Sequence, residues 1–387
     1  MKTLISTKIA LIFTAVSFLI VSQPAMSQEK KYEFGKGIRY TPKDSSFYMK
    51  FSVRAQNLYV GTYTDGGDPA YVSSFLIKRS RLKFDGYVLN PDLVYKFEFD
   101  VVGGYVRDAW VKYRFYKNLS VQYGLGKLPG NRERVVSSQK LGLVDRSQFN
   151  AAFNIDRDMG IWLYHHFKIG KSVFQETVAY TDGRGINDFT AHDGSSFTGR
   201  IDFLPLGKFA HKGDMSFADF EREKTPKIML GGVYNYNYKA IDMRGQNGSR
   251  LSDTRDLATV FVDFMLKYRG ITAFAEYGNK VSTTGSPVVL EDSLGNVEEA
   301  FYTGFGYNAQ LSYLFKNNWE VTGRYTVVLP EEITQNDEVY EYTLGLSKYI
   351  VGHNLKIQSD VTWRDNNVII DDTGEKIILR LQMELSF

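Results

Sequence analysis

Hydrophobic side chains recur at every second position over most of this chain. The pattern is clearest in the last nine residues, where apolar and polar side chains alternate from Leu379 to Phe387. Such alternation predicts an extended strand with one apolar and one polar face. We expect the apolar face of this strand to contact lipid, and the polar face, which carries Arg380, Gln382 and Glu384, to line an aqueous lumen.

The same alternation returns along the chain in segments that are separated by turn residues. Each apolar face holds about five residues, which suits a tilted strand of about 9–11 residues that crosses the hydrocarbon of a membrane. Beyond residue 27 we find no amphipathic helical pattern of about ten residues or more. The alternating segments lie at 47–56, 79–85, 93–100, 110–115, 260–268, 319–325, 355–364 and 379–387.

The connections between these segments are of two kinds. Short turns at one rim and long loops at the other are typical of bacterial outer-membrane barrels. Eight long polar segments predict an all-β fold, a transmembrane antiparallel β-barrel of about 16 strands with room for an aqueous lumen. The tight turns lie at 90–92, 116–118, 168–171 and 315–318, and the long segments at 61–72, 129–156, 182–195, 207–226, 240–255, 281–299, 330–338 and 365–375.

The amino-terminal residues predict export from the cytoplasm. Lys2 and Lys8 precede an apolar run at 9–21, and small residues follow it up to Ser27. This order of charge, apolar core and small residues is typical of a secretory signal, and the run is too short to span a bilayer as a helix. A buried N-terminal helix is the alternative interpretation of this segment.

We therefore expect three parts in the chain. Residues 1–27 form the signal peptide, 28–46 form a short and loose periplasmic lead-in, and 47–387 form the barrel domain. A soluble β-sandwich is the alternative fold. It would need two sheets that cover each other's apolar faces, together with helices or long covering loops for whatever face remained.

Composition supports the barrel and excludes several kinds of site. The chain has 26 Tyr and 27 Phe, which suit the aromatic girdles of a membrane barrel, and no Cys, so it has no disulfides and no thiolate metal ligands. Removing the two lysines of residues 1–27 leaves 45 basic against 44 acidic residues. A nearly neutral chain gives no indication of nucleic acid as a partner.

One long segment, 129–158, follows the predicted fifth strand. It combines arginines with apolar residues that can pack against a wall: Val135, Val136, Leu141, Leu143, Val144, Phe149 and Phe153. Long loops inside compact proteins are usually functional or disordered. We expect this loop to fold inward, narrow the channel, and present some of Arg132, Arg134, Arg146 and Arg157 to the solute.

Several of these segments resemble one known family. The run Lys78–Phe84 resembles the basic early strand of the phosphate-selective porin O and P family, and 127–160 is similar to its constriction region, through Val144-Asp145-Arg146-Ser147 and Arg157-Asp158-Met159-Gly160. Segments 199–207 and 352–356 match further parts of that family. The resemblance covers essentially the whole chain after the signal.

The resemblance implies a trimeric 16-stranded porin in the outer membrane of a Gram-negative bacterium. Its solutes would be small inorganic or organic anions, phosphate or polyphosphate among them, moving by passive diffusion. Its partners would be outer-membrane lipid, two further copies in a homotrimer, and the barrel-assembly machinery, which would bind the C-terminal strand ending in Phe387. No cofactor and no metal is expected. The lining role carries over to Arg79, Arg81, Lys83, Arg132, Arg134, Arg146, Arg157 and Arg200.

Three other functions remain open at this point. Carboxylates such as Glu98, Asp145 and Asp158 lie on or near the same polar faces, and they can pair with the arginines, which favours a general, weakly selective porin. A barrel enzyme would need a nucleophile and a base within reach of each other. His165 and His166 are neighbours on one strand and point to opposite faces, and no hydrolase or metal motif occurs, so we expect no enzyme. A structural or adhesin barrel would have a closed lumen and carry no current.

Overall fold

The computed structural model describes residues 33–65, 70–186, 188, 190–367 and 375–387. The predicted signal peptide, 1–27, lies outside the described residues. Among the described residues, no helix is long and apolar enough to cross a membrane.

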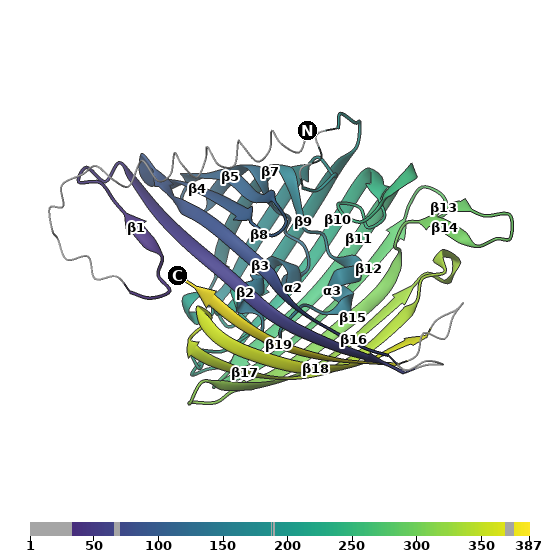
Figure 1. The fold of residues 1–387 in the computed structure, drawn as a ribbon. Coiled ribbons are helices and arrows are strands. Elements are labelled where there is room, and N and C mark those ends of the chain that lie inside the picture. Colours follow the sequence, from purple (N-terminus) through teal and green to yellow (C-terminus); the bar gives the residue numbers. More distant parts are fainter. Residues whose placement is uncertain (1–32, 66–69, 187, 189, 368–374) are drawn as a thin grey trace, which may run out of the picture. The chain divides into compact units, whose positions relative to one another are not determined.

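Sixteen antiparallel strands of the described chain form a closed barrel (Figure 1). Each strand pairs with its neighbours in sequence order, and the pairing of the last strand, β19, with the first barrel strand, β2, closes the sheet. The predicted fold class is therefore confirmed. The barrel strands are β2 (Phe47–Thr64), β3 (Ala70–Val88), β4 (Asn90–Asp100), β5 (Tyr105–Tyr116), β6 (Leu119–Lys127), β7 (Arg157–Ile169), β8 (Ser172–Thr181), β9 (Ser195–Leu204), β10 (Lys227–Asp242), β11 (Arg250–Tyr268), β12 (Ile271–Ser282), β15 (Gly304–Leu314), β16 (Trp319–Pro330), β17 (Glu338–Val351), β18 (Leu355–Asn367) and β19 (Lys376–Ser386).

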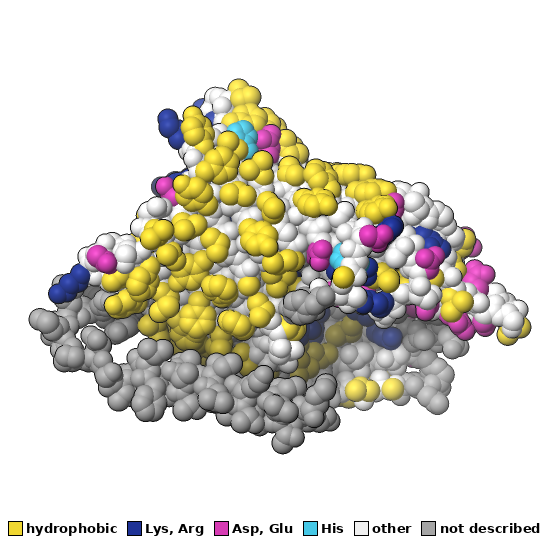
Figure 2. All heavy atoms as spheres, turned by 90° about the horizontal axis from the view of Figure 1, so that it is seen from above, with side chains coloured by type: hydrophobic (Ala, Val, Ile, Leu, Met, Phe, Trp, Pro, Cys, Tyr) yellow, Lys and Arg dark blue, Asp and Glu magenta, His cyan; other side chains and the backbone are white. Residues whose placement is uncertain are grey.

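The period of two in the sequence becomes an apolar outer wall and a polar inner wall. On β19, Leu379, Leu381 and Met383 are exposed on the outside, whereas Gln382 and Glu384 are buried inside. Figure 2 shows hydrophobic side chains spread over the outer wall with few charged side chains among them. An apolar surface of this extent suits lipid and would be unstable in water.

The connections alternate between two rims, as expected, but two of the predicted long segments differ and one connection was not predicted. The segment 61–72 is mostly strand, because polar residues continue the alternation to Thr64 and again from Ala70. The connection 101–104 on the long-loop rim is a tight turn with Gly104 at a φ of +69°. The long segment 207–226 joins β9 to β10, so strand direction places it on the short-turn rim. The predicted count of eight connections on the long-loop rim is nevertheless right. The prediction omitted 101–104 from that rim and wrongly included 207–226.

The long connection between β6 and β7 folds into the lumen, as predicted. Phe149 and Phe153 are fully buried, and Phe149 packs edge-on against Phe261 of the wall with ring centroids 6.2 Å apart. A Cβ at Gly278 or Gly306 would come within about 3 Å of these rings, so the wall needs glycine there. The connection 128–156, called the constriction loop below, contains the helices α2 (Arg132–Val135), η1 (Ser138–Lys140) and α3 (Gln148–Phe153).

The described part of the lead-in contains one short strand. β1 (Ile38–Tyr40) pairs with β2, with Ile38 opposite Phe51, on the edge of β2 that β19 leaves free beyond Phe387. The remaining elements lie in the rim connections: β13 (Val288–Glu291), β14 (Val297–Ala300), η2 (Ala210–Met215) and η3 (Glu332–Thr334).

Candidate ion pathway

Three adjoining cavities follow the inner wall of β2–β9 from one rim toward the other. The outer cavity, between the long loops, has a volume of about 690 Å³, the central cavity beside the constriction loop about 340 Å³, and the inner cavity toward the short-turn rim about 520 Å³. Arg107, Arg134 and Arg157 line both the outer and the central cavity. Lys96 and Lys127 line both the central and the inner cavity. The shared residues connect the three cavities into one pathway.

The central cavity has a strongly basic surface. Of its lining side chains ten are basic and one, Glu98, is acidic. Six carboxylates pair with seven of these cations: Glu98, Asp100, Asp108, Asp145, Asp156 and Glu384. Ten cations against six carboxylates leave an excess of four positive charges. The ten basic residues are Arg54, Arg79, Arg81, Lys96, Arg107, Lys127, Arg134, Lys140, Arg146 and Arg157.

Strand register brings the first group of charges together. Arg54 lies opposite Arg81, and Arg81 lies opposite Asp100, so the three side chains share the lumenal face. Arg81 bonds Glu98 at 2.7 Å and contacts Asp100 at 3.3 Å. Two adjacent arginines would repel each other, and the carboxylates offset that repulsion while leaving the guanidinium groups at the cavity surface.

Across the barrel seam, Arg54 of the first barrel strand donates to Glu384 of the last at 2.6 Å. The Glu384 carboxylate also accepts from Gln56 at 2.7 Å. The Glu384 side chain is completely buried, whereas Arg54 lines the central cavity. The positive partner of this pair therefore faces the cavity and the negative partner does not.

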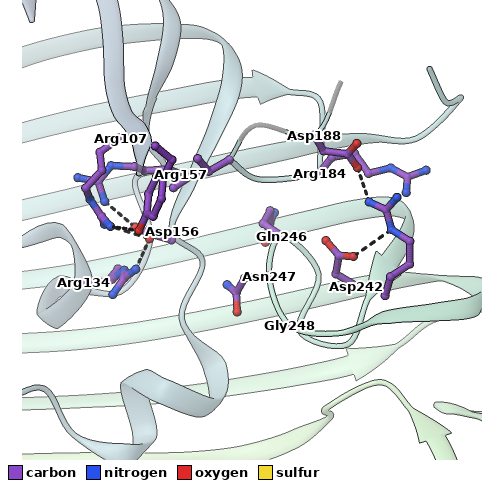
Figure 3. A pocket seen from close by; sticks show the side chains of 13 residues that line it. Arg107, Arg134, Asp156, Arg157, Arg184, Asp188, Asp242, Gln246, Asn247 and Gly248 are labelled. Carbon is purple, nitrogen blue, oxygen red and sulfur yellow. Dashed lines mark hydrogen bonds and ion pairs between the residues drawn. The ribbon is translucent and has the colours of Figure 1, made fainter. Parts of the chain in front are cut away.

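A second group converges where the constriction loop rejoins the wall. Arg157 contacts both oxygens of Asp108 at 3.2 Å and Asp156 at 3.0 Å, and Arg107 and Arg134 also pair with Asp156 (Figure 3). Burial acts to raise the pKa of Asp156, but Arg134 and Arg157 outweigh it and hold that pKa well below its usual value. Asp156 therefore stays ionised and fixes three guanidinium groups around the pathway.

Three cations of the central cavity are not neutralised by carboxylates within the described part of the chain. Arg146 donates to the carbonyls of Glu133 and Val136 at 2.8 Å, and Lys127 donates to loop carbonyls at 2.8 and 2.9 Å. Lys140 makes neither an ion pair nor a side-chain hydrogen bond there. Burial lowers the pKa of the Lys140 ammonium, and nearby ammonium groups lower it further. Because no carboxylate of the described chain pairs with them, these three cations account for much of the excess positive charge of the central cavity.

The eight residues predicted to line the channel fall into three groups, according to the cavity that they line. Arg79, Arg81, Arg134, Arg146 and Arg157 line the central cavity together.

Arg132 and Arg200 line the inner cavity, but both are held by Asp202 and Asp263. Arg200 contacts both oxygens of Asp263 at 2.8 Å and also donates to the Gly130 carbonyl of the constriction loop. This cluster fixes the loop to the wall. Lys83, which pairs with Asp85 at 3.0 Å, is not among the described residues that line these cavities.

The structure adds residues that the sequence did not single out. Arg54, Lys96 and Lys112 lie on the polar faces of alternating strands, so alternation placed them in the lumen without indicating their importance. Arg107 and Lys140 had no such signal. Lys208 and Lys212 come from the long segment on the short-turn rim and line the inner cavity.

Comparison with known proteins agrees with this architecture. The sequence model of the family described as phosphate-selective porin O and P matches residues 49–387. An uncharacterized protein of Aquifex aeolicus is 23% identical over 304 residues, which cover 73% of this chain and 68% of that protein.

Solved porin structures share the fold. The anion-selective porin from Comamonas acidovorans superposes with a TM-score of 0.56 at 12% identity, covering 88% of this chain and all of that one. The outer membrane channel DcaP of Acinetobacter baumannii gives 0.54 at 13% identity, covering 90% and 99%. The trimer form of OmpT, an outer membrane protein of Vibrio cholerae, gives 0.50 at 12% identity, covering 88% and 100%. At these identities the likeness concerns the fold alone.

Proposed function

Because the chain belongs to the phosphate-selective porin O and P family, we propose that it lets small anions diffuse across the outer membrane and that it prefers phosphate. The family and the closed barrel make the protein an outer-membrane channel rather than an enzyme, and they indicate a Gram-negative bacterium. The selectivity is the new part of the proposal.

The observation that carries the proposal is the charge at the surface of the central cavity. Ten cations and one carboxylate line it. A narrow pathway with walls of low dielectric constant focuses this field and raises the local concentration of anions. Guanidinium groups also offer paired donors that match the oxygens of phosphate.

From the sequence alone, carboxylates that pair with the arginines favour a weakly selective porin, but the geometry supports a different role for them. Glu384 is completely buried and lines none of the three cavities, whereas its partner Arg54 lines the central one. The carboxylates thus hold long cationic side chains in place and still leave an excess of four positive charges. Distributed, incompletely neutralised sites suit conduction, because a permeating ion must be bound and then released.

A general, weakly selective channel is the second candidate. The outer cavity favours it, because Asp156, Asp188 and Asp242 line that cavity beside its arginines. A solute entering from that side meets charges of both signs before it reaches the central cavity.

Bilayer recordings distinguish the two candidates. In a KCl gradient, the reversal potential should show chloride to be more permeant than potassium. Added phosphate should reduce the chloride current at concentrations well below that of chloride. An anion preference without inhibition by phosphate would support the general channel, and no preference would contradict the proposal.

The assembly and its partners are part of the same proposal. The likeness to the trimer form of OmpT and the apolar outer wall support a homotrimer embedded in outer-membrane lipid. The exposed aromatic ring of Phe387 at the end of β19 suits recognition by the barrel-assembly machinery. We also propose that residues 1–27 direct export and that 47–387 form the channel domain.

A further inference from the structure

The connection between β9 and β10 is far longer than the fold requires. The other connections on the short-turn rim have one to four residues, such as 117–118 and 269–270. The register of β9 and β10 places Leu230 opposite Phe203, and its continuation brings Lys227 opposite Leu206. The Lys227 ammonium donates to the Leu206 carbonyl at 2.8 Å. An ordinary two-residue hairpin turn could join these strands, yet the chain places residues 207–226 between them.

This segment crosses the mouth of the barrel. It leaves β9 and reaches the turn between β17 and β18, where the Ser216 hydroxyl lies 2.9 Å from the His353 ring nitrogen. There the Phe217 amide donates to the Lys140 carbonyl of the constriction loop at 3.0 Å. The segment therefore contacts both the far wall and the underside of the constriction loop.

The segment then returns to β10 along the rim. Arg222 donates to the Leu314 carbonyl at 2.5 Å, beside the turn between β15 and β16. Asp219 accepts from the Gly270 amide at 2.8 Å, and the Glu223 carbonyl accepts from the Arg269 amide at 3.0 Å, both at the turn between β11 and β12. These contacts fix the segment, called the rim strap below, over the half of the mouth bounded by β10–β18.

Apolar packing holds the rim strap inside the rim. Phe217 is fully buried and packs edge-on against Phe274 of the wall, with ring centroids 4.9 Å apart. Phe220 packs in the same way against Tyr349 at 4.9 Å. Phe220 also packs edge-on against His353, with ring centroids 5.0 Å apart. Three such contacts are typical of a fixed element, and a freely moving surface loop would not make them.

The edge of the rim strap that faces the inner cavity is strained. His211 and Lys212 have φ angles of 47° and 58°, in the left-handed region that residues other than glycine rarely adopt. Lys208, Lys212 and Met215 line the inner cavity directly below the central one. Strained backbone of this kind persists where the surrounding packing imposes it, and it concentrates at functional positions.

We infer that the rim strap closes the β10–β18 half of the short-turn mouth, so that solutes leave along the wall of β2–β9. Together with the constriction loop it sets the largest solute that can pass. This size limit applies to neutral solutes as well as to anions, so it goes beyond the proposed selectivity.

The direct test replaces residues 207–226 with Asn-Gly between Leu206 and Lys227. Opening half of the mouth should raise the single-channel conductance, because it widens one of the segments through which the ions pass in series. Liposomes should also swell faster in neutral sugars and should admit larger ones. The control removes residues 290–297 from the β13–β14 hairpin, which extends away from the barrel (Figure 1), and should leave both measurements unchanged. Equal conductance and equal sugar uptake in the strap variant would contradict the inference.

A second test does not depend on the folding of the deletion variant. The chain has no cysteine, so Lys212→Cys introduces a single thiol. A bulky neutral maleimide on that thiol should reduce the current and the uptake of neutral sugar, whereas the same label on Leu294→Cys, at an exposed hairpin tip, should not. Unchanged uptake by labelled Lys212→Cys would overturn the inference. Because sugars are neutral, these outcomes are independent of whether the channel prefers anions.

Discussion

Reversing the charge of Lys140 is the cleanest test of the proposed selectivity. Lys140 lines the central cavity, and within the described residues its ammonium makes no ion pair or hydrogen bond that the substitution would break. Lys140→Glu changes the local charge by two units and reduces the excess of four positive charges to two. The backbone contact of Lys140 with Phe217 is unaffected by the change of side chain.

The size of the effect follows from the dimensions of the cavity. A solute at the centre of a 340 Å³ cavity lies about 7 Å from an ammonium on its wall, where one unit charge contributes about 0.6 kcal/mol in water. The two-unit change is then about 1.2 kcal/mol, which screening in about 0.1 M salt roughly halves. We expect the occupancy of the cavity by a univalent anion to fall roughly threefold, and by more for a divalent phosphate.

The assay is the reversal potential of single channels in a KCl gradient, measured at low and at high salt. The potential should move toward that of potassium in Lys140→Glu, and the shift should shrink as the salt concentration rises. Lys117→Glu is the control, because Lys117 is exposed in the turn between β5 and β6 and carries the same change of charge. An identical reversal potential in Lys140→Glu and wild type would refute the assignment of the central cavity to the ion pathway.

Three further predictions follow from the same geometry. Because the pKa of Lys140 is lowered, its charge should be lost at a lower pH than that of a free lysine, so anion preference should decline as alkaline pH rises through that pKa, and Lys140→Gln should lack this component in pH-dependent recordings. Asp145→Asn removes the partner of Lys78 and Arg79, both at 3.0 Å; it should increase anion preference while lowering the free energy of unfolding in urea by about 1–3 kcal/mol. Phe149→Ala removes a fully buried ring of the constriction loop, so it should cost about 3–5 kcal/mol of stability and give larger, noisier channel openings; quiet channels of normal size would contradict that anchoring role.

The barrel could be predicted from sequence because each strand residue meets one of two environments. Leu381 and Gln382 are neighbours, yet one faces outward and the other is buried in the lumen, and period-two alternation records that difference residue by residue. The inward fold of the constriction loop was also predictable, since Phe149 and Phe153 are too apolar for a loop in water.

The rim of a long connection could not be predicted in the same way. Length and polarity can be read from the segment itself. The rim on which it lies depends on whether an odd or an even number of strands precedes it, so one missed turn between strands shifts the assignment. The segment 207–226 was therefore assigned to the wrong rim, and the tight turn 101–104 was not predicted.

The roles of individual arginines depend on contacts between distant parts of the chain. Arg200 meets Asp263 through the pairing of β9, β10 and β11, and this makes it an anchor of the constriction loop. Arg54 carried no family signal, yet pairing across the seam brings it to the central cavity. The alternation in the sequence indicated which strand residues face the lumen, but it did not indicate which charged side chains pair with each other.

The pair formed by Arg54 and Glu384 links the electrical properties of the channel to its biogenesis. During insertion, β2 and β19 are the two open edges of a growing sheet, and Arg54 acquires this carboxylate when those edges meet. A barrel that stalls before this step would present an uncompensated guanidinium at an open edge, which opposes its escape into lipid. We therefore expect that closing the hydrogen-bonded cylinder also completes the charge pairing of its conducting surface.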